Sequence, residues 1–183
     1  GLERLSNRAQ RLLTVLVDEG GVTESISRAV PIVLADLKLG FFPEGGDLVT
    51  GLPGRVYFEA QNAHGEPADV AGVVEDDKGT VVAHFTSVHD GLGRFGFTPE
   101  AGRSYRARIT APAGIDAHFE LPEALASGCT LRAFDDVRTQ VEKLRVAVRC
   151  NASREVLLVG ALREKTFDAA PVAATPWKDT VVH

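Results

Sequence analysis

Residues 55–62 read RVYFEAQN, and apolar side chains occupy alternate positions along this stretch. Val56, Phe58 and Ala60 fall on one face of an extended chain, because successive side chains of a β-strand point to opposite sides. Most of the intervening side chains are polar. This alternation predicts a strand with one face buried and the other exposed.

Short runs rich in valine, isoleucine, phenylalanine and tyrosine recur on both sides of this strand. They have the length of strands, and glycine, proline or aspartate residues end most of them. These runs are residues 11–18, 23–34, 37–42, 70–75, 80–87, 94–98 and 104–110. The sequence Asp-Asp-Lys-Gly at 76–79 predicts a hairpin turn, because Gly79 can supply the positive φ that such a turn requires.

The runs at 94–98 and 104–110 both carry aromatic side chains. Phe95 and Phe97 share one face of the first run, and Tyr105 lies on the apolar face of the second. Residues 99–102, with the sequence PEAG, form a turn signal between them. We therefore expect these two strands to pair with each other.

About six such runs occupy roughly 75 residues without an intervening helix, which is the spacing of an antiparallel β-sandwich. Only residues 2–13 approximate helical spacing. Prolines and a glycine at 111–122 indicate a linker, and strand-like runs resume at residues 129–134, 143–150, 155–162, 169–174 and 180–183.

The predicted fold is all-β, with tandem antiparallel immunoglobulin-like β-sandwich modules. We expect residues 1–35 to be the tail of a preceding module or N-terminal strands. Residues 36–122 would form one sandwich, and residues 123–183 a second that is minimal or truncated.

Composition narrows the function classes. The 183 residues carry a net charge of −5, which argues against a nucleic-acid partner. No stretch reaches the roughly 20 apolar residues of a spanning helix, so we expect no membrane insertion by this segment. The leading Gly1 and the absence of methionine indicate a piece of a longer protein.

The two cysteines, Cys129 and Cys150, are too few for a thiolate zinc site and are not spaced as a redox pair. They begin and end successive predicted strands. If Phe134 lies opposite Lys143 or Leu144, the two thiols come nearly opposite each other, within reach of a disulfide. The alternative is two buried free thiols that act as small apolar side chains.

Candidate reactive groups are few. His84, His89 and Asp90 could form a zinc or proton-transfer site, although a loop histidine more often bonds the backbone. Asn151-Ala152-Ser153 fits the N-glycosylation pattern. Carboxylates that could feed a calcium site are Glu44, Asp47, Asp69, Glu75, Asp76 and Asp77, but turn formation explains the aspartates more simply.

Neither a serine nucleophile nor a glycine-rich phosphate-binding loop has the surrounding sequence that it needs. Ser87 and Ser104 have no GxSxG motif around them, and the glycines at 45–46 and 91–93 do not open a helix. We therefore interpret both glycine pairs as turns.

Residues 41–49 (FFPEGGDLV), together with the strand at 55–60, resemble the opening of a macroglobulin-like (MG) domain of bacterial α2-macroglobulin-related or TonB-associated surface proteins. The similarity extends through residues 65–70 (GEPADV) and 87–99 (SVHDGLGRFGFTP) and covers residues 36–122. It implies an extracytoplasmic array of β-sandwiches, periplasmic or on the cell surface. Members of this family that trap proteases carry a CxEQ thioester motif. Cys129 is followed by Thr-Leu-Arg instead, so the resemblance does not assign protease trapping to this segment.

We therefore expect a non-catalytic scaffold or protein-interaction region that needs no cofactor. Its partners would be other domains of the parent protein or a second protein. One alternative is a carbohydrate- or ligand-binding sandwich that uses exposed aromatic side chains such as Tyr57 or Trp177, although the chain has only two tyrosines and one tryptophan. The other is a metal-dependent hydrolase that uses His84, His89 and Asp90.

Overall fold

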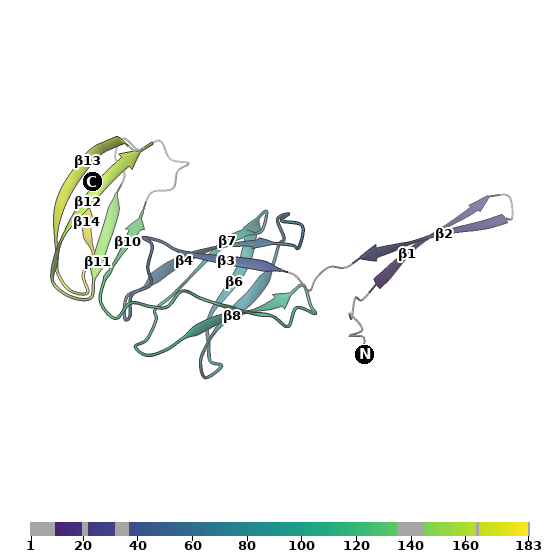
Figure 1. The fold of residues 1–183 in the computed structure, drawn as a ribbon, viewed down its shortest axis with the longest axis horizontal. Helices are drawn as coiled ribbons and strands as arrows, with labels where there is room; N and C mark the ends of the chain where they lie inside the picture. The colour runs from purple at the N-terminus through teal and green to yellow at the C-terminus, as the bar shows by residue number, and fades with distance from the viewer. Residues whose placement is uncertain (1–9, 20–21, 32–36, 135–144, 164, 183) are drawn as a thin grey trace, which may run out of the picture.

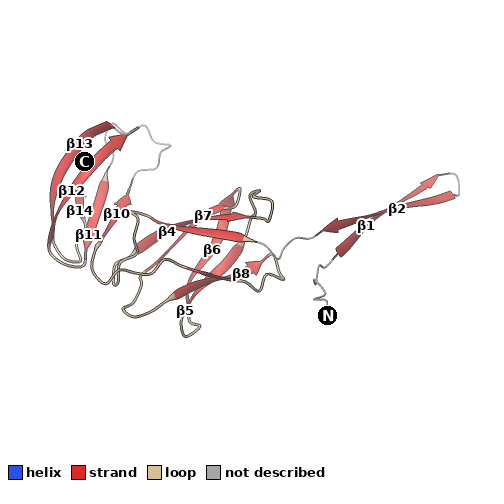
Figure 2. Cartoon of the chain, in the orientation of Figure 1, coloured by secondary structure: helices blue, strands red, loops and turns tan. Residues whose placement is uncertain are grey.

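The computed structural model describes residues 10–19, 22–31, 37–134, 145–163 and 165–182. Over these ranges the chain forms antiparallel sheets and no helix, as Figure 2 shows. The prediction of an all-β, immunoglobulin-like sandwich fold is confirmed. None of the described residues forms a helix that could cross a membrane.

The N-terminal strands form a two-stranded hairpin. β1 (Gln10–Glu19) pairs with β2 (Val22–Pro31) in a continuous antiparallel register. Leu12 and Leu13 lie in β1, so the helical spacing does not produce a helix there, because cross-strand pairing with β2 overrides it. The rest of that helical pattern, at residues 1–9, lies outside the described residues. Figure 1 shows this hairpin apart from the sandwich.

The first sandwich contains seven strands in two layers. One layer is β3 (Lys38–Pro43), β4 (Gly54–Gln61) and β7 (Leu92–Phe97); the other is β5 (Ala71–Asp76), β6 (Val81–His89), β8 (Tyr105–Ala111) and β9 (His118–Glu120). β6 connects the layers, because most of its length pairs with β5 and its end pairs with β7. The alternation predicted for β4 is confirmed: Val56, Phe58 and Ala60 are buried.

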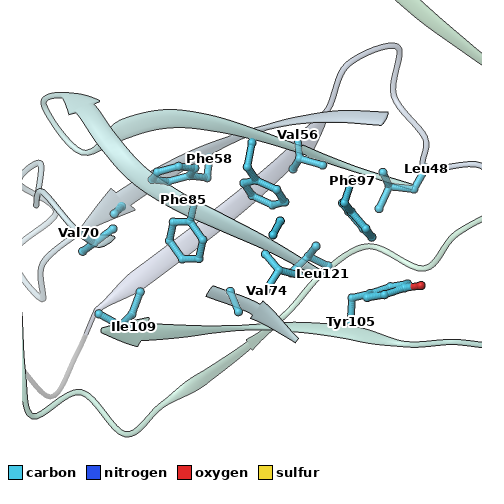
Figure 3. Packing of buried hydrophobic residues seen from close by; sticks show 14 of the residues in the cluster. Leu48, Val56, Phe58, Val70, Val74, Phe85, Phe97, Tyr105, Ile109 and Leu121 are labelled. Carbon is cyan, nitrogen blue, oxygen red and sulfur yellow. The ribbon is translucent and has the colours of Figure 1, made fainter. Parts of the chain in front are cut away.

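Aromatic rings fill the space between the layers (Figure 3). The ring of Phe58 meets Phe85 edge-on at a centroid distance of 5.0 Å, and Phe97 meets Tyr105 in the same way at 4.8 Å. The expectation that the strands bearing these last two rings pair with each other is wrong. β7 pairs with β4, whereas β8 pairs with β5, so the turn at 99–102 crosses between the layers. The edge-on contact of Phe97 and Tyr105 is therefore made across the core and not between paired strands.

The segment predicted to be a linker, residues 111–122, belongs to the first sandwich. β9 pairs with β8 there, and Ile115 and Leu121 are buried in the same core as the phenylalanines. The prolines and glycine therefore mark turns of this module rather than its boundary.

The C-terminal strands form a smaller sandwich. One sheet is β10 (Cys129–Ala133), β11 (Val146–Cys150) and β14 (Thr180–Val182), and the other is the hairpin of β12 (Arg154–Leu162) and β13 (Lys165–Ala174). Val148 and Cys150 from the first sheet share a buried cluster with Val172 and Ala174 from the second.

The register of β10 and β11 differs from the expected one. Cys129 lies directly opposite Cys150, and the N–H of Phe134 donates to the carbonyl of Arg145. Phe134 thus bonds to Arg145, whereas the residues expected opposite it, Lys143 and Leu144, lie outside the described residues. The direct pairing of the cysteines fixes this register, because a slip by one residue would turn every side chain of the strand to the other face.

The predicted β5–β6 turn is held by Asp76. Its Oδ1 accepts hydrogen bonds from the N–H groups of Lys78, at 3.0 Å, and Thr80, at 2.7 Å, while Gly79 has a φ of 80°. The hydrogen bond from Thr80 is the main cause that lowers the pKa of Asp76 from its ordinary 3.8. The bond from Lys78 and the charge of Arg103 act in the same direction, and burial opposes them.

We predict that Gly72→Ala destabilises the protein by about 1–3 kcal/mol, because the added Cβ overpacks the core. That Cβ would lie 2.5 Å from the carbonyl oxygen of Arg108 and against the ring of Phe85. Gly96→Ala is the matched control on an exposed strand face, where the nearest atom would be 3.4 Å away. Urea denaturation of both variants tests this, and equal midpoints would contradict it.

We also predict a pH-dependent effect for Asp76→Asn. A lowered pKa in the folded state means that ionised Asp76 stabilises the fold above pH 3.8, and that this contribution disappears as the pH falls through the folded-state pKa. The variant should therefore be less stable than the wild type at neutral pH. The difference in stability between the two proteins should shrink as the pH falls below 3.8. Thermal melts across pH measure it. Exposed Asp116→Asn is the control, and a gap that stays constant with pH would refute the assignment.

Candidate functional site

The site best defined by the structure is the joint between the two sandwiches. It is built on the loop after β3, where Leu48 and Val49 are fully buried. Val49 and Leu125 form a parallel bridge, in which the N–H of Leu125 donates to Leu48 at 2.8 Å and the N–H of Thr50 donates to Leu125 at 2.9 Å. The chain that enters the second sandwich is thereby hydrogen-bonded to the first.

Asn151 links both sides of this joint through its amide. Its Oδ1 accepts from the N–H of Gly128 at 3.1 Å, and its Nδ2 donates to the carbonyls of Ala126 at 2.9 Å and Thr50 at 3.4 Å. Its backbone N–H also donates to Gly128. A single side chain thus holds the connecting segment and the loop of the first sandwich together.

Glu44 makes a second link, at the other side of the loop. Its Oε1 accepts from the N–H of Ala133 in β10 at 3.2 Å, and its Oε2 lies 3.5 Å from Nε of Arg55 in β4. Gly45, with a φ of 89°, lets β10 approach, since a Cβ there would lie 2.9 Å from the backbone nitrogen of Leu131.

Trp177 makes a third link from the second sandwich. Its ring covers Gly51, where a Cβ would lie 2.9 Å from the ring atoms Cη2 and Cζ3. The backbone N–H of Trp177 donates to the carbonyl of Cys150, which ties the backbone of Trp177 to the end of β11.

Cys129 and Cys150 form a disulfide at this end of the second sandwich. The bond joins the first residue of β10 to the last residue of β11, and the residues beside it are Gly128 and Asn151 of the joint. Closing a loop with a sequence separation of 21 residues stabilises a fold by about 3 kcal/mol in the chain-entropy account. The disulfide therefore anchors the strands on which the joint depends.

The structure does not bring the histidines into a site. His89 and Asp90 form an exposed pair, with 3.0 Å between Nε2 and Oδ2, and His84 is exposed on β6. Among the described residues, no group of three or more histidine, cysteine or acidic side chains is placed to hold a metal ion.

Most of the candidate calcium ligands have other partners. Asp69 accepts from the N–H of Gly91 at 2.9 Å, and Glu75 accepts two hydrogen bonds from Arg108. Asp77 pairs with Arg103, while Asp76 closes its turn. The hydroxyl of Ser87 accepts from the N–H of Val70, so it too has a structural role.

The side-chain nitrogen of Asn151, the atom that glycosylation would modify, already donates hydrogen bonds in the structure. The amide nitrogen of Asn151, to which a glycan would attach, is the donor that bonds Ala126 and Thr50. Modification there would disturb the joint, so the geometry favours a structural role for Asn151.

Sequence reasoning did not identify the joint. Glu44, Leu125 and Trp177 are far apart in sequence, and none stands in a motif whose chemistry points to such a contact. The sequence feature that could have indicated the joint is the pair of glycines at 45 and 51. In the structure, residues of the second sandwich approach both of them too closely to leave room for a side chain.

No protein family model matches the sequence, and no curated protein matches it at a significant level.

We predict that Asn151→Ala lowers the free energy of unfolding by about 1–2 kcal/mol, because the N–H of Gly128 and the carbonyl of Ala126 lose their partner. Ser153→Ala is the matched control: it removes the glycosylation pattern but leaves the amide of Asn151 in place. Chemical denaturation of both variants checks this. An equal loss in the two would show that the sequon, and not the amide contacts, matters.

Proposed function

We propose that this chain is a non-catalytic β-sandwich scaffold and protein-interaction region of a larger extracytoplasmic protein of the macroglobulin-like type. The observation that carries the proposal is the joint. Two sandwiches connected by a flexible linker would move independently, whereas these two are joined by hydrogen bonds that Leu125 and Asn151 donate and that Glu44 accepts. Such a joint suits a protein whose role is to hold surfaces at fixed positions.

The way the polar side chains are used supports the same function. The carboxylates of Glu44, Asp69, Glu75 and Asp76 accept hydrogen bonds within turns, between strands or across the joint. Charged groups in catalytic sites are instead arranged to meet a substrate in a shared pocket. The chemistry of these residues is thus that of a framework.

The proposed compartment is supported by the disulfide between Cys129 and Cys150. Structural disulfides persist in oxidising environments such as the periplasm and the cell surface, and are rare in the cytosol of mesophiles. The sequence resemblance over residues 36–122 supports the same location.

Residual dipolar couplings test the scaffold role. If the joint is rigid, the amides of the strands from β3 to β9 and those from β10 to β14 fit one alignment tensor. Replacing both Glu44 and Asn151 by alanine removes contacts on both sides of the loop and should separate the fit into two tensors. Ser153→Ala is the control and should retain one tensor. Two tensors of different magnitude in the wild type would overturn the proposal.

A further inference from the structure

Three arginines converge beside the joint. A recess of about 480 Å³ lies on the outer side of β4 and β7, and its lining includes Arg55 from β4, Arg94 from β7 and Arg132 from β10. Two of these arginines belong to the first sandwich and one to the second. The recess therefore exists in this form only when the two sandwiches are joined.

The charge of the recess is the opposite of that of the whole chain. The protein has a net charge of −5, yet the recess gathers three guanidinium groups. Glu44 lies 3.5 Å from Arg55 and offsets one positive charge. In the described part of the chain no carboxylate pairs with Arg94 or Arg132, and the guanidinium of Arg132 stacks over Phe134 at 5.5 Å. A concentrated, incompletely neutralised positive charge favours an anionic ligand.

Within the described ranges, no side chain fills the centre of the recess. Arg55 lies directly opposite Gly96, and Arg94 precedes Gly96 by two positions on the same face of β7. Of the atoms in the described part of the chain, a Cβ on Gly96 would meet one within 4 Å, the carbonyl oxygen of Gly54 at 3.4 Å. A carboxylate can therefore enter between the arginines, whose planar guanidinium groups bind carboxylates through paired hydrogen bonds.

An aromatic surface continues from the arginines. Phe42 lies opposite Tyr57, and Tyr57 lies opposite Arg94, so the three form a row across β3, β4 and β7. Phe42 is 56% exposed and Tyr57 is 39% exposed. Aromatic and arginine side chains are the types enriched at protein–protein contacts. A small inorganic anion would use the arginines alone, whereas a polypeptide can use both parts.

We propose that this arginine–aromatic surface, formed by Phe42, Arg55, Tyr57, Arg94 and Arg132, binds an acidic segment of a partner protein. Glutamate or aspartate side chains of the partner enter the recess, and a neighbouring apolar side chain covers Phe42 and Tyr57. This inference rests on the proposed scaffold function and supplies the kind of partner that the scaffold holds. Since Arg132 comes from the second sandwich, binding needs both modules and an intact joint.

A fluorescein-labelled peptide of alternating glutamate and phenylalanine residues is the probe. Fluorescence anisotropy on the full chain should show binding at low salt that weakens at high salt, because exposed charges are screened. The counterpart with glutamine in place of glutamate should not bind. A counterpart with serine in place of phenylalanine should bind more weakly.

Substitutions locate the contact. Arg94→Gln and Arg132→Gln should each weaken binding by about tenfold or more, because each removes a charge-assisted pair. Arg94→Lys should recover part of the loss, and Tyr57→Ser should also weaken binding. Lys78→Gln, which removes one exposed positive charge at the β5–β6 turn, is the control and should bind as the wild type does.

Three results would overturn the inference: no binding of the acidic peptide at low salt, binding unaffected by both arginine variants, or binding insensitive to Tyr57→Ser with full displacement by sulfate. The last would show a small-anion site instead of a peptide site. The dipolar-coupling experiment is run on the same protein. Failure to bind by a chain that fits one alignment tensor refutes the partner and leaves the scaffold role intact.

Discussion

The packing of aromatic rings between the two layers of the first sandwich is the constraint on which the remaining structure depends. Phe58 and Phe85 meet at the centre of this core, and the backbone opposite them comes so close that only glycine fits at positions 72 and 93. The strands are therefore held at one separation. The loop that carries Leu48 and Val49 is buried against this framework, and it is the loop to which the second sandwich attaches.

Much of this framework could be predicted from the sequence, because strand periodicity reports directly on which side chains are buried. The alternation around Phe58 gave the buried face of β4 correctly, and the aspartate–glycine turn at 76–79 gave the β5–β6 hairpin. Pairing was harder. The turn after Phe97 looks like a hairpin turn, but the strand that follows joins the opposite layer, and local sequence carries no information about which layer a strand enters.

The candidate site could not be predicted for a related physical reason. Asn151 acts by satisfying the backbone groups of Gly128, Ala126 and Thr50, and an asparagine that does so has the same local sequence as one that carries a glycan. The three arginines of the recess are likewise 39 and 38 positions apart, and only the antiparallel order of β4 and β7 and the docking of β10 bring them together.

Glu44 connects the joint to the recess. Its carboxylate pairs with one of the three arginines, Arg55, and one of its oxygens accepts the hydrogen bond from the N–H of Ala133, the neighbour of Arg132. The other oxygen lies 3.5 Å from Nε of Arg55, and no acceptor among the described residues bonds the outer nitrogens of that guanidinium. The same side chain thus fixes the strand that presents one arginine and orients another. Because the disulfide fixes the far end of that strand, the position of Arg132 is set from both sides, and the positive surface depends on the same contacts as the joint.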